Sequence, residues 1–252
     1  MYGTLLIGTA GSGKSLLTKA LSDILKSKDL DTITVNLDPG VMNLPYEPEV
    51  DIRNLITVNE IMEKYSLGPN GAMIMASDLL AVKLDEINEE VAHLRPDYVL
   101  VDTPGQMELF AFRASGPYVA RELDFESKLV LFLFDAVFSN DPTNFVSNLF
   151  LSTAAYHRFL LPQYSVLSKV DLLPEKEIEK MVLWSEDPSE LELAVQSQLT
   201  GDIRLISIDL LNAIASLEQN FTLFPVSATT YEGVLELDAA IQRQFRGGEE
   251  IF

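Results

Sequence analysis

The feature that most constrains this chain is a glycine-rich segment close to its N-terminus. Residues 8–15 read GTAGSGKS and match the pattern G-x-x-x-x-G-K-[ST] in full. An apolar run at residues 3–8 precedes the segment, and an amphipathic stretch at residues 14–26 follows it. In this strand–loop–helix context, converging backbone N–H groups and a helix N-terminus hold phosphates. The segment therefore predicts a phosphate-binding loop rather than a plain glycine-rich turn.

Five further apolar runs of strand length lie along the chain, at residues 33–37, 98–101, 129–134, 164–167 and 221–226. Stretches with helical periodicity separate them, at residues 77–94, 143–159, 188–199 and 203–217. Apolar strands that alternate with helices are typical of a parallel sheet covered on both faces. We therefore predict an α/β fold: a three-layer αβα P-loop NTPase with a mainly parallel sheet and helical insertions.

Two connections are longer than a minimal sheet-and-helix unit requires. Residues 39–96 separate the second and third predicted strands, and residues 171–220 separate the fifth and sixth. Both exceed the short connections that are usual between strands and helices. We expect one domain over residues 1–252, with helical insertions at these two places.

The composition disfavours several classes of function. The chain has 38 Asp and Glu against 18 Lys and Arg, a net charge of −20 at pH 7. Nucleic acids and anionic membranes are bound by clustered Lys and Arg, so we expect neither as a direct partner. The chain has no Cys and two His, His93 and His157, which argues against zinc–thiolate or other His-based metal sites. No segment resembles a leader or a spanning helix, so a cytoplasmic protein is expected.

Residues within the predicted loop have distinct expected roles. Lys14 is expected to reach the β- and γ-phosphates of a nucleotide, and Ser15 to offer its hydroxyl to Mg²⁺. The expected nucleotide-binding residues of this segment are Gly11, Ser12, Gly13, Lys14, Ser15 and Leu16.

Two carboxylates follow predicted strands where magnesium chemistry requires them. Asp102 ends one apolar strand and begins the segment DTPGQ, so we expect it in the Mg²⁺ shell. Gly105 supplies an N–H that can approach a γ-phosphate, and Gln106 is a candidate to orient water. Asp38 ends another strand before Pro39. Taken alone, Asp38 is typical of a β-turn before proline. Taken with the loop and Asp102, it is a candidate metal ligand and a candidate to position or deprotonate the attacking water.

Two further strand ends carry a predicted site for the base. Ser168–Asp171 resembles the [NTS]-K-x-D element of GTPases. Asp171 can accept two hydrogen bonds from guanine N1–H and N2–H₂, whereas adenine offers no such pair, and Lys169 can lie along the base plane. Ser227 and Ala228 follow the last predicted strand, and the Ala228 N–H is a candidate contact to guanine O6. The alternative is a solvated strand exit.

These segments, together with GPNG at residues 68–71, closely resemble the GPN-loop GTPases. The matching segments are GTAGSGKS at 8–15, NLDPG at 36–40, PYEPEVDIR at 45–53, GPNG at 68–71, DTPGQMELF at 102–110 and SKVD at 168–171. Taken alone, GPNG is only a turn signal. The whole set occurs in one order and covers most of the chain, which makes the resemblance specific.

The resemblance implies a Mg²⁺-dependent homodimer of the archaeal type that binds GTP and releases GDP. It implies that the loop formed by Gly68, Pro69 and Asn70 enters the partner's site, with Asn70 near the γ-phosphate. The catalytic residues would then be Lys14, Asp38, Asn70 and Gln106. Related dimeric ATPases carry a Lys early in the phosphate loop, where this chain has Thr9. Without that cation in trans, slow turnover is expected.

Three functional readings remain open at this stage. The chain is a GTPase in its own right, or a chaperone-like binding module whose slow hydrolysis is only a timer. The resemblance suggests a protein client such as an RNA polymerase subunit for such an assembly factor. A partitioning-type dimeric ATPase is the weaker third reading.

Several other residues have expected structural roles. Trp184 and four phenylalanines are expected to pack in the core; the four are Phe110, Phe112, Phe145 and Phe150. The resemblance also implies a partner-binding groove near these phenylalanines. Residues 171–192 contain eight acidic and two basic residues, counted along the sequence, and form either a solvated helical face or a docking face for a basic partner.

Overall fold

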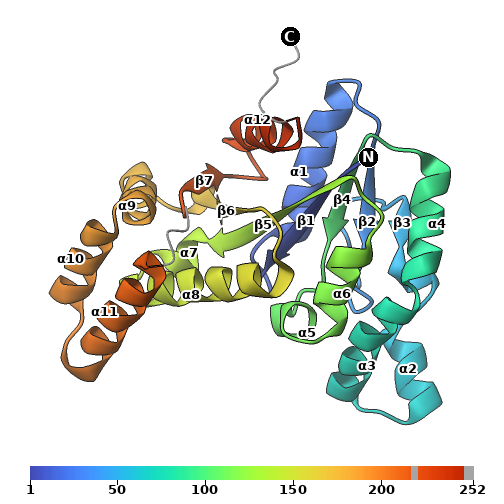
Figure 1. Cartoon of the computed structure of the whole chain (residues 1–252), viewed down its shortest axis with the longest axis horizontal. Coiled ribbons are helices and arrows are strands. Elements are labelled where there is room, and N and C mark those ends of the chain that lie inside the picture. Colours follow the sequence, from blue (N-terminus) through green and yellow to red (C-terminus); the bar gives the residue numbers. More distant parts are fainter. Residues whose placement is uncertain (217–220, 247–252) are drawn as a thin grey trace.

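A parallel β-sheet of seven strands forms the centre of the computed structural model, which describes residues 1–216 and 221–246 (Figure 1). The strand order is β3-β2-β4-β1-β5-β6-β7, and every recorded strand pair is parallel. The strands are β1 Tyr2–Gly8, β2 Thr32–Asn36, β3 Val50–Asp51, β4 Tyr98–Asp102, β5 Ser127–Asp135, β6 Gln163–Ser168 and β7 Leu223–Val226. The predicted αβα fold with a mainly parallel sheet is confirmed.

Helices follow almost every strand, as the alternating pattern predicts. They are α1 Lys14–Ser27, α2 Val58–Tyr65, α3 Pro69–Val82, α4 Leu84–Leu94, α5 Met107–Ala111, α6 Ser115–Glu122, α7 Ala136–Ser139, α8 Pro142–Phe159, α9 Glu175–Glu186, α10 Pro188–Gln198, α11 Gly201–Ala215 and α12 Val234–Phe245. Short 3₁₀ turns lie at Ile52–Asn54 and Val170–Leu172. The predicted helical ranges did not include α5, α6, α7 or α12, and α2 and α9 were predicted only as parts of the two helical insertions.

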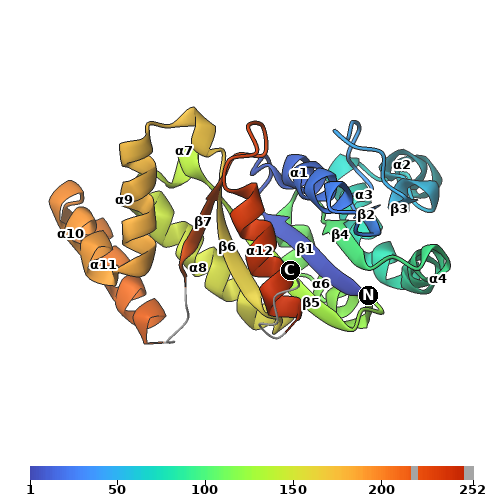
Figure 2. The same ribbon diagram turned by 90° about the horizontal axis from the view of Figure 1, so that it is seen from above.

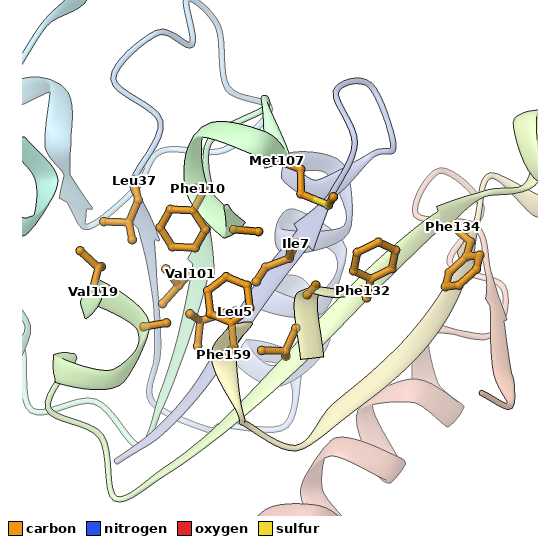
Figure 3. Close-up of a cluster of buried hydrophobic side chains, with 14 of the residues drawn as sticks. Leu5, Ile7, Leu37, Val101, Met107, Phe110, Val119, Phe132, Phe134 and Phe159 are labelled. Atoms are coloured by element: carbon orange, nitrogen blue, oxygen red, sulfur yellow. The ribbon is translucent and has the colours of Figure 1, made fainter. Parts of the chain in front are cut away.

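The sheet is covered on both faces because its strands alternate apolar side chains between two cores. In β1, Leu6 packs with α1 and α12, whereas Leu5 and Ile7 belong to the core on the opposite face. Helices α5, α6 and α8 cover that opposite face (Figure 1). Figure 3 shows the centre of this core, where Phe110 of α5 lies close to Leu5 and Phe159. Burial on both faces explains why the strands read as continuous apolar runs.

The two long connections lie at opposite ends of the sheet. Helices α2, α3 and α4 pack beside β2 and β3, while α9, α10 and α11 pack beyond β7 (Figures 1 and 2). Figure 2 shows that the central strands between these groups carry α1 and α12.

No helix in the described ranges is both long and apolar enough to cross a lipid bilayer.

The prediction of one helix over residues 77–94 is wrong. Two helices occupy this region, because α3 ends at Val82 and α4 begins at Leu84. Lys83 lies between them, and its N–H donates to the carbonyls of Leu79 and Leu80. Helix α3 also begins eight residues earlier than predicted, at Pro69. The buried positions keep helical spacing across the break, so the sequence pattern hides it; they are Leu80, Leu84, Ile87 and Val91.

The prediction that four phenylalanines pack in the core is also wrong for two of them. Phe110 and Phe145 are fully buried, but Phe112 is 39 % exposed and Phe150 46 % exposed. Phe150 lies on α8 beside the buried Leu149, on the side of the helix that faces away from the sheet. The position of a phenylalanine on a helical stretch therefore did not show whether it lies on the buried side of the helix.

Trp184 is buried, as predicted, whereas the last strand starts later than predicted. Trp184 is buried against Phe145, with ring centroids 5.3 Å apart. His93 and His157 are exposed near the C-terminal ends of α4 and α8. The last strand begins at Leu223 rather than at residue 221. The predicted helix end at residue 217 and the predicted end of the second insertion at residue 220 lie outside the described residues.

Candidate nucleotide-binding site

The motif residues meet because the parallel strands present their carboxyl ends at one edge of the sheet. Strand β4 lies between β1 and β2, so that Asp102 pairs in register with Leu6 and with Asn36. The loop after β1, the turn after β2 and the segment after β4 therefore start side by side.

The phosphate loop has the backbone that its glycines permit. Gly11 and Gly13 have φ values of 77° and 93°, a left-handed conformation that strains other residues. Lys14 opens α1 and folds back over the loop, where its Nζ donates to the carbonyls of Gly8 at 2.9 Å and Thr9 at 3.0 Å. Its side chain is buried, and this burial lowers the pKa of Lys14. The ammonium group of Lys14 is thus held against the backbone of the loop by two carbonyl oxygens.

A cavity of about 380 Å³ lies between the loop and the neighbouring strand ends. Its lining residues are Gly11, Gly13, Lys14, Ser15, Leu16, Asp38, Val41, Pro45, Thr103 and Gly105. The structure therefore brings together most of the predicted phosphate and metal residues. Neither Gln106 nor Asn70 is among these lining residues.

Asp102 is the most constrained carboxylate of the site, at 2 % exposed. Tyr46 donates a hydrogen bond from its hydroxyl to Asp102 Oδ2 at 3.0 Å, whereas Oδ1 has no partner in the described structure. Burial raises the pKa of Asp102 to about 6, although the Ser15 and Tyr46 hydroxyls and Lys14 oppose the shift. The hydroxyl of Ser12 in the loop is likewise buried without a partner. Buried polar atoms without partners indicate that the site is completed by a ligand.

Asp38 links the turn after β2 to the segment after β4. Its Oδ2 accepts a hydrogen bond from the Gly105 N–H and its Oδ1 from the Gly40 N–H, both at 2.8 Å. Asn36 holds this turn, because its Oδ1 accepts from the Asp38 N–H at 3.0 Å and its Nδ2 donates to Asp51 at 2.9 Å. The carboxylate is therefore held in place by backbone donors.

Gln106 contacts the first turns of α3, the helix whose second residue is Asn70. Gln106 Nε2 is 3.7 Å from Met73 Sδ, one helical turn after Asn70. Gly68 is the N-cap of α3 and Pro69 its first residue, a position that suits proline. Asn70 is exposed at the second position of the helix. The GPN segment is thus a helix start that presents its side chains to the outside.

The candidate base-binding segment is tied directly to the phosphate loop. Ser168 Oγ, at the end of β6, donates to the Ser12 carbonyl at 2.7 Å. Lys169 has a φ of 63°, and its Nζ forms an ion pair with Asp135 at 2.6 Å. Asp171 is exposed in the 3₁₀ turn that follows. The hydroxyl of Ser168 therefore couples the two loops despite replacing the commoner Asn or Thr.

The segment after β7 reaches the same edge. Strand β7 pairs with β6 so that Val226 lies opposite Ser168, and Ser227 and Ala228 follow directly. Ser227 is fully buried, and its hydroxyl accepts from the Thr230 N–H at 3.1 Å. Ala228 is half-buried. The two candidate base-recognition segments are therefore neighbours in space.

Three residues of the site were not assigned a role from sequence. They are Tyr46, which donates to Asp102; Asn36, which holds Asp38; and Asp135, which pairs with Lys169. Asp135 ends an apolar strand, the same signal that identified Asp38 and Asp102. Tyr46 lies in an irregular segment and does not end a strand, so its sequence signal is its position in the segment PYEPEVDIR at 45–53.

Comparisons with known proteins identify relatives of this chain. A family model described as "Conserved hypothetical ATP binding protein" matches residues 6–247. The GPN-loop GTPase 2 homolog of Dictyostelium discoideum is 31 % identical over 96 % of this chain and 79 % of its own length. The GPN-loop GTPase QQT2 of Arabidopsis thaliana is 35 % identical over 76 % of this chain, which spans about half (51 %) of that protein.

An archaeal relative has been solved. The GPN-loop GTPase PAB0955 of Pyrococcus abyssi is 34 % identical over 92 % of each chain. Its crystal structure in the apo form matches this fold with a TM-score of 0.86, covering 97 % of both chains at 31 % identity. The relatives are named GTPases, in keeping with the guanine-specific carboxylate expected at Asp171. This chain therefore belongs to the GPN-loop GTPases, enzymes that bind GTP and hydrolyse it to GDP and phosphate.

Proposed function

We propose that this GTPase is a Mg²⁺-dependent molecular switch that works as a homodimer. The observation that carries the proposal is the Oδ1 of Asp102, which is buried without a partner among the described residues, while the Ser15 hydroxyl that interacts with this carboxylate belongs to a residue lining the phosphate cavity. Leaving a buried carboxylate oxygen without a donor is costly. Hydroxyl and carboxylate oxygens are the ligands that Mg²⁺ prefers, so these residues fit the ion.

The metal-binding residues in this proposal are Ser15 and Asp102, with Asp38 as a further candidate. When bound, Mg²⁺ neutralises charge on the β- and γ-phosphate oxygens. Lys14 exchanges the Gly8 and Thr9 carbonyls for phosphate oxygens, which requires only a movement of its flexible side chain.

Hydrolysis in this proposal uses the link between Asp38 and Gly105. In the structure the Gly105 N–H donates to Asp38. When that N–H turns to the γ-phosphate, the carboxylate is released to orient or deprotonate the attacking water. Gln106, next in the chain, helps to position the same water. Exchange of one hydrogen bond would thus couple nucleotide binding to activation of the carboxylate.

The guanine site in this proposal uses both segments at the β6 and β7 ends. Asp171 accepts from guanine N1–H and N2–H₂, Lys169 lies along the base, and the Ala228 N–H meets O6 with Ser227 beside it. The phosphates contact the loop residues Gly11, Ser12, Gly13 and Leu16. The hydrogen bond from Ser168 to Ser12 supports this proposal, because it joins the base and phosphate segments.

We further propose that Asn70 acts in the partner's site and not in its own. The exposure of Asn70, and its absence from the lining of its own cavity, support an action in trans. Because Asn70 is neutral, it stabilises a transition state less than a cation would, and slow hydrolysis is expected.

A mixing experiment tests this arrangement. Asn70→Ala and Lys14→Ala are each expected to lower single-turnover GTP hydrolysis at least about tenfold, because each removes a group that positions phosphate or water. Mixed together, they form heterodimers in which the Asn70→Ala subunit keeps Lys14 and receives Asn70 from its partner. Hydrolysis should then recover in part.

Asn212→Ala is the matched control, since Asn212 is an exposed asparagine on α11. Its hydrolysis rate should equal that of the wild type. An unchanged rate in Asn70→Ala, or no recovery in the mixture, would contradict action in trans. Sedimentation with a GTP analogue and Mg²⁺ gives the oligomeric state independently.

The physiological role in this proposal is assembly of a protein complex in the cytoplasm, with a client such as an RNA polymerase subunit. The resemblance to GPN-loop GTPases supports this reading. If hydrolysis is the selected activity, a client should accelerate GTP turnover. If the protein is instead a chaperone-like module with hydrolysis as a timer, the client's affinity should differ between GTP and GDP states while turnover stays constant.

A further inference from the structure

A second, larger cavity lies away from the phosphate loop, between α9 and the β7–α12 segment. We call it the acidic groove; its volume is about 870 Å³. Ile178 and Val182 of α9 form one apolar wall, and Phe224 and Pro225 of β7 form the other. In Figures 1 and 2 helix α9 lies alongside β7 at the edge of the sheet. The groove is therefore a surface feature built by the edge strand and one insertion helix.

Carboxylates surround this apolar floor. The acidic lining residues are Asp171, Glu175, Glu179, Glu186, Glu232 and Glu236, all of them exposed. None of the lining residues in the described structure is Lys or Arg. Of the two lysines on α9, Lys180 lies over the Trp184 ring and Lys176 is outside the lining. The negative charge of the groove is thus not neutralised by cations within it.

The α9 wall has the pattern of an unpartnered helix face. Ile178, Val182 and Leu183 form an apolar strip at helical spacing, with glutamates at 175, 179 and 186 beside it. Leu183 is 45 % exposed, whereas Met181 and Trp184 on the other side of α9 are buried. The strip therefore adds apolar surface that the fold of this chain leaves open to solvent.

The edge strand on the other wall is a poor template for an added β-strand. Pro225 has no N–H, and the Leu223 N–H already donates to Ser185 of α9 at 3.2 Å. An extended peptide would therefore find too few free backbone donors to pair with. A helix that presents side chains to the groove meets no such obstacle.

We infer that the acidic groove binds a cationic amphipathic helix of a partner protein. The apolar side of such a helix covers the floor, and its Lys or Arg side chains meet the surrounding carboxylates. Val170 and Asp171 line the groove and also belong to the predicted base-binding segment Ser168–Asp171, so the occupant contacts the end of that segment. The inference specifies the chemistry of the client in the proposed function and rests on that proposal for its biological meaning.

A synthetic helix probes the groove directly. The probe is a fluorescent peptide of about 14 residues, roughly four helical turns, with Leu on one face and Lys on the other. Its affinity for the nucleotide-free protein is measured by anisotropy at several salt concentrations. A second peptide with Ser in place of each Leu keeps the charge and removes the apolar face.

Two variants with the same change in charge separate the groove from the general acidity of the protein. Glu179→Lys combined with Glu186→Lys alters the groove, while Glu89→Lys combined with Glu90→Lys alters exposed positions on α4. We expect the groove variant to bind the Leu–Lys peptide at least about tenfold more weakly, and the α4 variant to bind like the wild type. Leu183→Ser should weaken binding as well.

Three results would overturn the inference. They are equal weakening by the two charge variants, equal affinity for the Leu and Ser peptides, and no binding to the wild type. The basal GTPase rate of the groove variant is measured in parallel and should be unchanged. Because peptide binding needs no nucleotide, its failure is distinguishable from a failure of the trans mechanism in the mixing experiment.

Discussion

At the scale of single residues, the site contains a carboxylate whose burial lowers the stability of the fold. Asp102 is almost fully buried, keeps one oxygen without a partner, and has a pKa raised to about 6 by that burial. A buried ionised carboxylate opposes folding, so Asp102 lowers the stability of the fold. In the proposed function this carboxylate serves to bind Mg²⁺.

Replacing Asp102 with Asn should stabilise the nucleotide-free protein. The pKa of Asp102 is about 6 in the fold against an ordinary value of 3.8 in the unfolded chain, so the native state binds more protons between these values. Wild-type stability therefore falls as pH rises from about 4 to 6. The variant should gain about 3 kcal/mol at pH 7 and about half of that at pH 5. Urea denaturation at both pH values checks this, and an equal gain at both would contradict it.

Replacing Tyr46 with Phe should weaken the dependence on magnesium specifically. The phenol donates to Asp102 Oδ2 and helps to keep that carboxylate ionised and oriented. Loss of one such hydrogen bond should raise the Mg²⁺ concentration for half-maximal hydrolysis about two- to tenfold, with kcat at saturating Mg²⁺ nearly unchanged. Tyr65→Phe on α2, where the tyrosine is exposed, is the control. An unaltered Mg²⁺ dependence would show that Tyr46 does not position Asp102.

At the scale of elements, periodicity predicted where helices occur better than where they end. The break at Lys83 was hidden because apolar spacing continues from α3 into α4. The sequence also does not indicate how closely α5 and α6 pack. A Cβ on Gly116 of α6 would lie 1.8 Å from the Phe110 carbonyl oxygen. That contact, and not an unusual backbone conformation, requires glycine there.

Gly116→Ala should therefore destabilise the fold by at least about 3 kcal/mol, because a backbone oxygen cannot move aside as a side chain would. Gly71→Ala is the matched control. Its Cβ would meet only Leu67, at 3.6 Å or more, and alanine is the better helix former by about 0.5–1 kcal/mol. Thermal unfolding of both variants tests the difference. Similar melting temperatures would mean that α6 shifts freely away from α5.

At the scale of the whole molecule, the net charge of −20 opposes an anionic ligand. Lys14 and the loop N–H groups must attract GTP against this general field. Salt should screen the repulsion, so the association rate of Mg²⁺·GTP should rise about two- to tenfold between about 0.05 M and 0.3 M salt. Stopped-flow fluorescence with a labelled GTP measures it. The variant with Glu89→Lys and Glu90→Lys should show a smaller rise, and a rate that falls with salt would refute the argument.

The sequence by itself determined the fold class and the residues of the phosphate loop. A loop of this kind is local, because its glycines, Lys14 and the following helix act within a few residues. Strands buried on both faces are also readable as apolar runs. The order of the segments along the chain was enough to indicate the family.

The tertiary structure decided which groups from distant segments face one another. The hydrogen bonds from Tyr46 to Asp102, from Gly105 to Asp38 and from Ser168 to Ser12 join segments that only strand pairing brings together. The acidic groove likewise exists only because α9 packs against the edge strand β7. Sequence patterns record periodicity within a segment, whereas burial, partner choice and cavities depend on how separate segments are packed in space.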